Sequence, residues 1–353
     1  MFVLTLQKNI FNMIFDEIHQ SFQEIFTKTT RTVLVVHSNP DGDALGSALA
    51  LSAVLNGKGH PTQVVIPNMY PSFLAWMPHL EEAIVFEGNA PEARKALQEA
   101  ELVFCLDFNH FKRAGTLHSD LEKLQVPVAM IDHHVEPDLE AFTYVYSDIK
   151  VSSTAELVYS FIKGMNWLDA INEEVASCLY VGIMTDTGSF SYALKNPNTF
   201  HIVAELVNKG IDAERLHRMV YDTFSENRLR LLGHAISNKM MILDSCKAAI
   251  ITLTLNDLND FNFQIGDTEG IVNVPLSMEA INFAVLITEK KDQVRLSFRS
   301  KGSFSVNDFA RKHFEGGGHF NAAGGSSALN LKDTISKLLK TIQEHCEELN
   351  YTY

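Results

Sequence analysis

The sequence predicts an α/β protein: an N-terminal doubly wound domain around a parallel sheet, a helical connector and a smaller C-terminal α+β domain. Up to about residue 150, short apolar segments typical of buried strands alternate with helical segments. The chain is then mostly helical to residue 244, and strands dominate again from residue 245. These changes suggest four parts: an amphipathic N-terminal helix (1–30), the doubly wound domain (31–210), the connector (211–244) and the C-terminal domain (245–353).

Composition limits the possible functions. The chain has 353 residues, of which 46% are apolar, enough for a core in each of two domains. The formal net charge of −14 argues against a protein that holds long duplex nucleic acid by general electrostatic attraction. An anionic substrate would need a local positive centre, such as a bound metal ion. The cysteines show no paired spacing, which fits a reducing compartment and excludes a cysteine-based zinc motif (Cys105, Cys178, Cys246 and Cys346).

The N-terminal segment is interpreted as an amphipathic helix rather than a targeting segment. Apolar residues recur at helical spacing between Ile10 and Phe26, and we expect this face to pack against the following domain. Residues 1–6 are apolar but too few for a signal peptide, and Met13 is an alternative start to Met1. No run approaches the ~20 apolar residues of a transmembrane helix, so we expect a cytoplasmic protein without membrane contact.

In the first domain, strands and helices alternate. The predicted strands cover residues 32–36, 62–66, 83–86, 102–106 and 128–131, and the predicted helices cover 44–56, 91–100 and 112–124. Functional groups in such sheets collect at the carboxyl ends of the strands. We therefore expect a site formed by the polar residues that follow three of these strands: His37, Asp41 and Asp43 after the first, Asp107 after the fourth, and Asp132, His133 and His134 after the fifth.

The helical stretch begins with a capping pattern. Residues 153–156 (Ser-Thr-Ala-Glu) match a capping box that opens a helix to Lys163, and we interpret these residues as caps rather than catalytic groups. A second helix, from about residue 172, ends near Asp186, with Gly188 as its stop signal. A carboxylate at the end of so apolar a helix requires a partner. Further helices are predicted at 198–209, 213–221 and 226–240.

The C-terminal domain contains a glycine-rich segment. Predicted strands at 247–254, 283–288 and 293–299 and helices at 306–313 and 332–349 surround it. The run Gly316, Gly317, Gly318, His319 is interpreted as a loop whose N–H groups could approach an anion closely. With the nearby basic residues it could grip a phosphate or a terminal nucleotide; a flexible hairpin turn is the alternative (Arg299, Lys301, Arg311 and Lys312).

The polar strand ends have the chemistry of a metal centre. Two imidazoles and four carboxylates favour manganese, magnesium or iron over structural zinc (His37, Asp41, Asp43, Asp107, His133 and Asp186). Six ligands exceed the usual complement of one ion, and Asp107 is the best candidate to bridge two. Such a centre hydrolyses phosphoesters or phosphoanhydrides. Alternatively, each carboxylate could be a helix cap or a solvated turn residue, and Asp43 in particular could cap its helix.

These residues resemble a known family. His37-x-Asn-Pro-Asp41-x-Asp43-Ala, Asp107 after its strand, Asp132-His133-His134 and Asp186-Thr-Gly-x-Phe resemble the four motifs of the DHH-superfamily phosphoesterases. The run from Gly316 to His319, followed by Ala-Ala-Gly at 322–324, is similar to the signature of their C-terminal DHH-associated domain. The resemblance covers about residues 20–345, with every motif position intact.

The resemblance implies two Mn²⁺ ions, or Mg²⁺ or another divalent ion, as cofactors. One ion would be held by His37, Asp41 and Asp107, and the other by Asp43, Asp107, His133 and Asp186. His134 would contact the scissile phosphate, and Asp132 would orient the histidines. The C-terminal domain would bind substrate through Arg299, Gly316, Gly317, Gly318 and His319; Arg113 is a weaker phosphate-binding candidate, since a surface arginine at a helix start is equally compatible.

The compact two-domain layout is similar to the nanoRNase and pAp phosphatase branch. This implies a 3′–5′ oligoribonuclease that degrades very short RNAs and removes the 3′-phosphate from 3′-phosphoadenosine 5′-phosphate (pAp). The alternatives are a phosphodiesterase for linear or cyclic dinucleotides such as pApA and cyclic di-AMP, a short-chain exopolyphosphatase, and a non-catalytic nucleotide sensor that keeps the fold. Short RNA or pAp would be the binding partner, and the resemblance suggests a homodimer.

Overall fold

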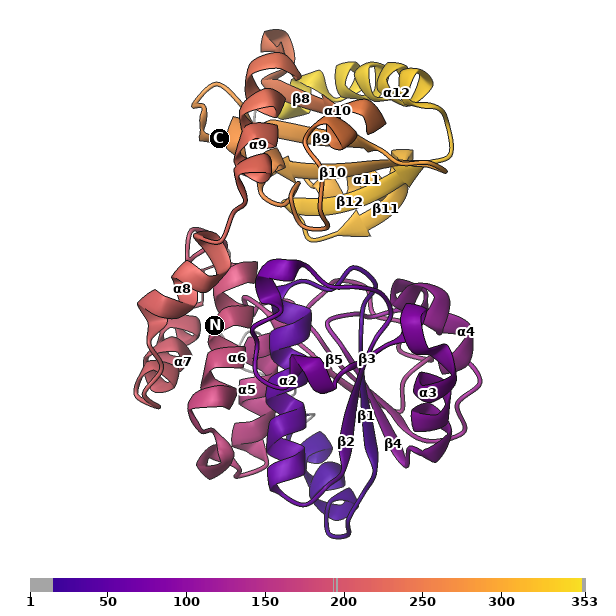
Figure 1. Cartoon of the computed structure of the whole chain (residues 1–353), viewed down its shortest axis with the longest axis vertical. Coiled ribbons are helices and arrows are strands. Elements are labelled where there is room, and N and C mark those ends of the chain that lie inside the picture. The colour runs from indigo at the N-terminus through magenta and orange to yellow at the C-terminus, as the bar shows by residue number, and fades with distance from the viewer. Residues whose placement is uncertain (1–14, 193, 195, 351–353) are drawn as a thin grey trace, which may run out of the picture. The chain divides into compact units, whose positions relative to one another are not determined.

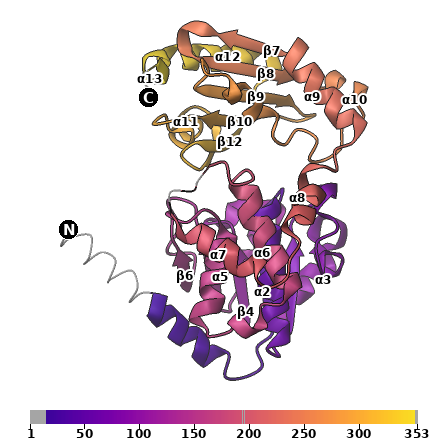
Figure 2. The same ribbon diagram turned by 90° about the vertical axis from the view of Figure 1, so that its left-hand side faces the viewer.

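The computed structural model describes residues 15–192, 194 and 196–350 (Figures 1 and 2). The chain divides into two compact units, residues 1–223 and 224–353, and each is described here by itself. The division falls inside the predicted connector 211–244: α8 (Ala213–Tyr221) is part of the first unit and α9 (Glu226–Asn238) of the second.

The first unit is built on a six-stranded parallel sheet, as predicted. Its strand order is β3-β2-β1-β4-β5-β6, and every neighbouring pair is parallel. In this order the chain reverses direction across the sheet between β1 and β4, and in such folds ligands bind at the carboxyl ends of the strands at that point. The strands are β1 (Thr32–Val36), β2 (Thr62–Ile66), β3 (Ile84–Val85), β4 (Leu102–Leu106), β5 (Val128–Asp132) and β6 (Tyr144–Ser147).

Helices cover both faces of this sheet (Figure 1). On one face, α2 (Gly42–Gly57), α5 (Thr154–Gly164) and α6 (Glu173–Asp186) share a core with the inward side chains of the strands. A Cβ on Gly46 of α2 would lie 2.4 Å from the carbonyl oxygen of Cys178, so glycine allows α2 and α6 to pack closely. The opposite face is covered by α3 (Phe86–Glu99) and the segment from 111 to 121.

The remaining helices of the chain are short or peripheral. In the first unit, α7 (Asn198–Val207) precedes α8; the second unit contains α10 (Leu255–Asp260), α11 (Val306–His313), α12 (Leu331–Glu344) and α13 (Cys346–Asn350) besides α9. Among the described residues, no helix combines the length and apolar character needed to cross a membrane.

The N-terminal helix packs against the first unit, as predicted. Residues 15–25 are helical, and the buried Phe22 ring lies against Phe104 and Phe161. Phe15 stacks on Tyr146 at a ring distance of 4.1 Å. The rest of the predicted helix, including Ile10, and both candidate start residues lie outside the described residues.

In this unit one local prediction is wrong and one strand was not predicted. The helix expected at 112–124 is a 3₁₀ segment, Phe111–Leu117, followed by the short α4 (His118–Leu121). Gly115 has φ = 60°, which ends a right-handed helix, and the sequence prediction did not weigh that glycine. Strand β6 was not predicted, because its four residues carry too short an apolar pattern to be distinguished from a loop.

The second unit is α+β, as predicted, and its sheet is mixed. The strand order is β11-β12-β10-β9-β8-β7, in which only β8 and β9 are parallel neighbours. Its strands are β7 (Met240–Leu243), β8 (Ala248–Leu253), β9 (Phe283–Glu289), β10 (Val294–Ser300), β11 (Glu315–Gly318) and β12 (Ala322–Ser327). The last residue of the helix predicted at 226–240 therefore belongs to β7.

The glycine run lies in a strand, so the expectation of a loop is wrong for Gly316–Gly318. These residues form β11, which pairs with β12 across a turn at 319–321, so the alternative of a flexible hairpin turn is also wrong for them. A Cβ on Gly316 would lie 2.1 Å from the carbonyl oxygen of Gly324. At Gly316, therefore, glycine permits the close approach of two strands.

The cysteines correct another expectation. Cys246 and Cys346 form a disulfide, although they are separated by 100 residues in the sequence. Cys246 lies in a 3₁₀ turn after β7, and Cys346 begins α13. Cys105 and Cys178 are buried and free. Since spacing alone does not reveal a pair this far apart, the absence of a spacing pattern gives no argument for a reducing compartment.

Candidate metal centre

The predicted polar residues of the first unit meet at the carboxyl ends of β1, β4 and β5. His37 follows β1 directly, Asp107 follows β4, and Asp132 is the last residue of β5. Because β4 lies between β1 and β5 and all three are parallel, their ends come together at one edge of the sheet. His37, Asp107 and Asp132 are all buried.

The first group of donors is His37, Asp41 and Asp107. Their ligand atoms lie within 4.8 Å of one another, and His37 Nε2 is 3.3 Å from Asp107 Oδ2. His37 Nδ1 lies 2.9 Å from the carbonyl oxygen of Ser38, so Nδ1 carries the proton and donates it there. The lone pair of Nε2 then faces the carboxylates. A metal-binding histidine has this arrangement.

The second group is Asp43, Asp107 and His133, with Asp186 beside it. His133 Nε2 lies 3.7 Å from Asp43 Oδ2, 3.6 Å from Asp107 Oδ1 and 3.4 Å from Asp186 Oδ2. The two oxygens of Asp107 thus face different groups: Oδ2 faces His37 and Oδ1 faces His133. This is the arrangement expected of a carboxylate shared between two donor sets.

The buried carboxylates repel one another. Burial, together with the charges of Asp107, Asp186 and Asp41, raises the pKa of Asp43 well above its usual value. Burial also opposes ionisation of Asp107, but His37, His134 and His133 outweigh it and hold the Asp107 pKa below its usual range. A buried set of this kind becomes favourable when a cation neutralises it. The donors present therefore fit a divalent metal.

The N-terminus of α2 supplies both aspartates of the first motif. Asp41 is the N-cap, and its Oδ1 accepts hydrogen bonds from the N–H groups of Asp43 and Ala44 at 3.0 and 3.1 Å. The alternative in which Asp43 caps the helix is therefore wrong. Asp43 is almost fully buried, whereas the Asp41 side chain is half exposed.

Sequence reasoning missed the contribution of α5. The N–H groups of Thr154 and Ala155 donate to the two carboxylate oxygens of Asp43 at 2.7 and 2.8 Å. The Thr154 hydroxyl donates to Asp107 Oδ1 at 2.8 Å. The start of α5 thus holds two of the proposed ligands in place. Its capping pattern located the helix start, but nothing in the sequence indicated what lies next to it.

The capping box itself is only half formed. Ser153 is the N-cap, and its hydroxyl accepts from the N–H of Glu156 at 3.2 Å. The Glu156 carboxylate instead accepts from the N–H and hydroxyl of Ser152 and from the hydroxyl of Thr199. The expectation that Ser153 caps this helix is confirmed. The Glu156 side chain does not bond back to the Ser153 N–H, as a capping box requires, but joins buried hydrogen bonds with Ser152 and Thr199.

Asp132 holds His134 through two hydrogen bonds. His134 Nδ1 lies 2.7 Å from Asp132 Oδ1, and the His134 N–H donates to Asp132 Oδ2 at 3.0 Å. Nδ1 donates a hydrogen bond to this carboxylate. In the neutral ring, therefore, Nδ1 carries the proton and Nε2 does not. Burial, the largest influence on both, lowers the pKa of His134 and raises that of Asp132 to about 6. Both side chains are buried.

Arg113 lies near the centre, within the 3₁₀ segment after β4. Burial is the largest influence on the pKa of His37, Asp132 and His134, and the positive charge of Arg113 acts in addition to lower each of them, although the pKa values of His37 and Asp132 are raised overall. Its carbonyl oxygen also accepts from the N–H of Ser38 at 2.7 Å, which ties this segment to the residue after His37. The side chain is half-buried.

The other predicted substrate-binding residues gather on one part of the second sheet. Arg299 in β10 is paired with Ala322 in β12, and β12 in turn pairs with the glycine strand β11. His319 lies in the turn between β11 and β12, where its N–H donates to the carbonyl of Ala322. The N–H of Gly318 donates to Asn307 Oδ1 at 2.9 Å.

Comparison with known proteins gives the family. Residues 31–183 match the model of the DHH family N-terminal domain, and residues 247–348 match the DHHA1 domain. A Streptococcus mutans protein named "probable bifunctional oligoribonuclease and PAP phosphatase NrnA" is 29% identical over 310 residues, 87% of this chain and 93% of the relative. The Bacillus subtilis protein named "bifunctional oligoribonuclease and PAP phosphatase NrnA" is 26% identical over 317 residues, 90% of this chain and 95% of the relative.

A solved structure agrees with these matches. The crystal structure of an exopolyphosphatase-related protein from Bacteroides fragilis is 36% identical, with a TM-score of 0.89 over 95% of this chain and 98% of that one. The sequence motifs, the strand-end cluster and these matches lead to one conclusion. This chain belongs to the DHH family, with an N-terminal DHH domain followed by a DHHA1 domain.

Proposed function

We propose that this protein is a two-metal phosphohydrolase that degrades short oligoribonucleotides and removes the 3′-phosphate from pAp. The observation that carries the proposal is the position of Asp107, whose two carboxylate oxygens face different histidine-containing donor groups. Relatives named as oligoribonucleases and pAp phosphatases, matched over nearly their whole length, support the substrate class.

The proposed cofactors are two Mn²⁺ ions. His37, Asp41 and Asp107 would hold one, and Asp43, Asp107, His133 and Asp186 the other. When bound, such a pair supplies a nucleophile from water at neutral pH and stabilises charge on the phosphoryl group. The α5 N-terminus keeps Asp43 and Asp107 oriented through the N–H and hydroxyl groups of Thr154. Outer contacts of this kind set ligand orientation and basicity.

His134 and Arg113 are the proposed phosphate-facing groups of the first unit. Asp132 fixes the His134 ring by its Nδ1–H, so Nε2 remains as the atom that can meet the substrate. Arg113 supplies a fixed positive charge beside the cluster, which suits a phosphate oxygen. In the second unit, Arg299, His319 and the glycines of β11 are proposed to recognise the substrate end. A short substrate can be held at its end without a long basic track.

A turnover panel tests this function. The protein is stripped of metal with EDTA and assayed with Mn²⁺, Mg²⁺ or no metal on pAp and on RNA of roughly two to five nucleotides. Linear pApA, cyclic di-AMP, tripolyphosphate and a long duplex are the comparison substrates. We expect metal-dependent release of phosphate from pAp and mononucleotides from short RNA, and no cleavage of the duplex.

The panel separates the proposal from its rivals. Faster turnover of pApA or cyclic di-AMP than of short RNA and pAp would assign the protein to the dinucleotide phosphodiesterases. Preference for tripolyphosphate would make it an exopolyphosphatase. Tight binding of pAp without turnover under any metal would indicate a nucleotide sensor. Each of these results would contradict the proposed substrate assignment.

A further inference from the structure

Two histidines of the second unit face each other outside the residues discussed so far. His313 is the last residue of α11, and His345 is the C-cap of α12. Their Nε2 atoms lie 3.1 Å apart, and the ring planes make an angle of 78°. In a simple hydrogen bond between them, one Nε2–H donates to the lone pair of the other Nε2.

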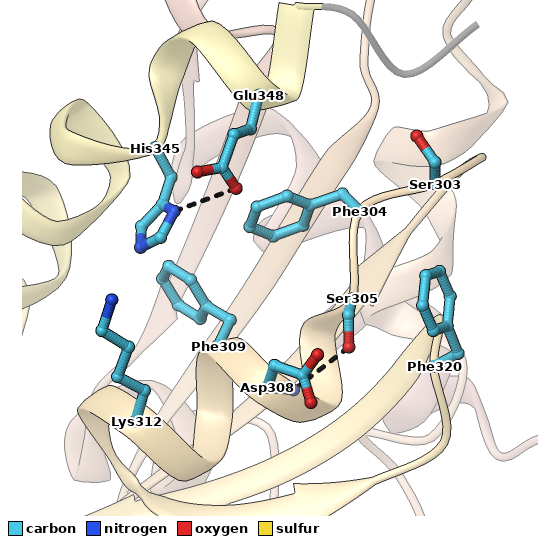
Figure 3. Close-up of a pocket in the computed structure, with 9 residues that line it drawn as sticks. All are labelled: Ser303, Phe304, Ser305, Asp308, Phe309, Lys312, Phe320, His345 and Glu348. Atoms are coloured by element: carbon cyan, nitrogen blue, oxygen red, sulfur yellow. Dashed lines mark hydrogen bonds and ion pairs between the residues drawn. The ribbon is translucent and has the colours of Figure 1, made fainter.

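The tautomer of His345 is fixed by a carboxylate. His345 Nδ1 lies 3.2 Å from Glu348 Oε2 (Figure 3). Because a carboxylate accepts, Nδ1 carries the proton and the lone pair of Nε2 faces His313. A metal-binding histidine has this arrangement: one nitrogen on the metal, the other donating to a carboxylate. Burial, aided by the nearby His345, lowers the pKa of His313 and so favours its neutral, ligating form.

The separation of the two nitrogens fits a zinc ion. With Zn–N bonds of about 2.05 Å, nitrogens 3.1 Å apart subtend about 100° at the metal, close to the tetrahedral value. The ring centroids lie 5.3 Å apart, so the two nitrogens point nearly at each other, and each ring would have to turn for both lone pairs to meet one ion. Here two imidazoles would bind the ion and no carboxylate would. Such a ligand set suits zinc, nickel or copper rather than manganese, which prefers oxygen ligands.

Open space adjoins His345. A pocket of about 540 Å³ is lined by His345, Glu348, Asp308 and Lys312 among others (Figure 3). Water from this pocket can complete a coordination shell to which the protein contributes two ligands. Besides burial, the nearby Lys312 and Lys337 lower the pKa of His313, and Glu344 raises it. A positive charge at Lys312 therefore weakens cation binding, whereas Glu348 strengthens it.

We propose that His313 and His345 form a zinc-type site in the second unit, with Glu348 as the carboxylate that orients His345. A bound ion would connect the end of α11 to the segment between α12 and α13. The site is separate from the oxygen-rich cluster of the first unit and does not depend on the proposed function.

Zinc stoichiometry tests the site. Untagged full-length protein is titrated with Zn²⁺ against a chromophoric chelator, without thiol reductant, so that Cys246 and Cys346 stay in their disulfide and offer no thiolate ligand. Relative to wild type, His345→Gln should bind one zinc equivalent fewer. His79→Gln is the matched control, because His79 also contacts carboxylates, those of Glu82 and Glu174. It should keep the wild-type stoichiometry.

Two further variants keep the test decisive if His345→Gln fails to fold. Glu348→Gln should weaken zinc binding at this site by about 10- to 100-fold, the usual effect of losing such a carboxylate. Lys312→Ala should strengthen it. Unchanged zinc stoichiometry in His345→Gln, or unchanged zinc affinity in Glu348→Gln, would mean that the two rings form only an N–H···N hydrogen bond.

Discussion

Asp107 has an unusual backbone as well as a central side chain. Its φ of 65° lies in the left-handed region, which non-glycine residues seldom adopt and which occurs at functional sites. The strand end is thereby turned so that Oδ2 meets His37 and Oδ1 meets His133 and Thr154. The unusual backbone conformation of Asp107 therefore helps to place its carboxylate between the two donor groups.

Replacement of Asp107 by asparagine should abolish metal-dependent activity. Asparagine tolerates the left-handed backbone, so the fold should persist, but the bridging charge is lost. We expect turnover of pAp to fall by at least about 100-fold, beyond the range typical of outer-sphere partners. Manganese binding, measured by calorimetry, should weaken in parallel. Asp169→Asn, an exposed partner of Lys58, is the control and should be unaffected; wild-type manganese affinity in Asp107→Asn would contradict the bridging role.

The Thr154 hydroxyl should strengthen manganese binding by holding the Asp107 carboxylate in place. Thr154→Val keeps the shape but removes the bond to Asp107, and we expect manganese affinity to drop by about 10- to 100-fold. Thr154→Ser should restore most of it. Thr199→Val offers a matched comparison, because that buried hydroxyl binds Glu156, which is not a proposed ligand. Equal manganese affinities for the Val and Ser variants of Thr154 would show that the hydroxyl is dispensable.

Most residues of the proposed metal cluster could be predicted, because each follows an apolar strand or ends an apolar helix, where an unpaired charge is costly. Thr154 and Ala155 could not, because their role depends on which helix start lies beside the strand ends. Arg113 was left open between a phosphate ligand and a surface residue, and only the folded chain shows its charge acting on His37 and His134.

At the level of elements, segments with a clear apolar pattern were predictable and segments without one were not. Strands β2 and β4 and helices α8 and α11 match their predicted bounds, since each has a clear apolar pattern and a definite end. Strand β6, the break at Gly115 and the strand at Gly316–Gly318 were missed. In those cases pairing with a neighbouring strand or a single backbone angle decides the structure, and local sequence carries little information about either.

One carboxylate, that of Asp257, stabilises the start of helix α10. Asp257 closes a capping box with Thr254 and also contacts His234 and Lys239, both at 2.9 Å. Although burial alone would raise its pKa, these hydrogen bonds hold the pKa of Asp257 well below its usual range. A carboxylate with a depressed native pKa stabilises the fold above its unfolded-state pKa. This contribution declines as the pH falls below that value and is lost as the pH falls through the native pKa.

Asp257→Asn should therefore destabilise the second unit in a pH-dependent way. We expect a loss of about 1–2 kcal/mol at neutral pH, which should shrink as the pH drops below roughly 4. Urea unfolding of both proteins at several pH values measures the difference. Asp333→Asn is the control, since Asp333 occupies the same position in α12 and contacts the Asn330 cap without a cationic partner in the described contacts. A difference that stays constant down to pH ~3 would contradict the charge-based explanation.

At the scale of the whole molecule, each unit has its own core. In the first unit, separate apolar clusters fill the two faces of the parallel sheet, and the second unit repeats this arrangement around its mixed sheet. The proposed ligands of the first unit all come from residues 37–186, whereas the disulfide lies entirely within the second unit. Metal and disulfide should therefore stabilise different parts of the chain.

Calorimetry should show two unfolding transitions, one for each unit, that respond to different treatments. Manganese at about 100 times its dissociation constant should stabilise the first unit by about 2.7 kcal/mol for each bound ion and raise the midpoint of one transition only. A thiol reductant that opens the Cys246–Cys346 bond, which closes a loop of 100 residues, should lower the midpoint of the other transition, because the unfolded second unit gains roughly 2–4 kcal/mol of freedom. EDTA should reverse the first shift without changing the second. A single transition that moves with both treatments would show that the two units unfold together and that their stabilities are coupled.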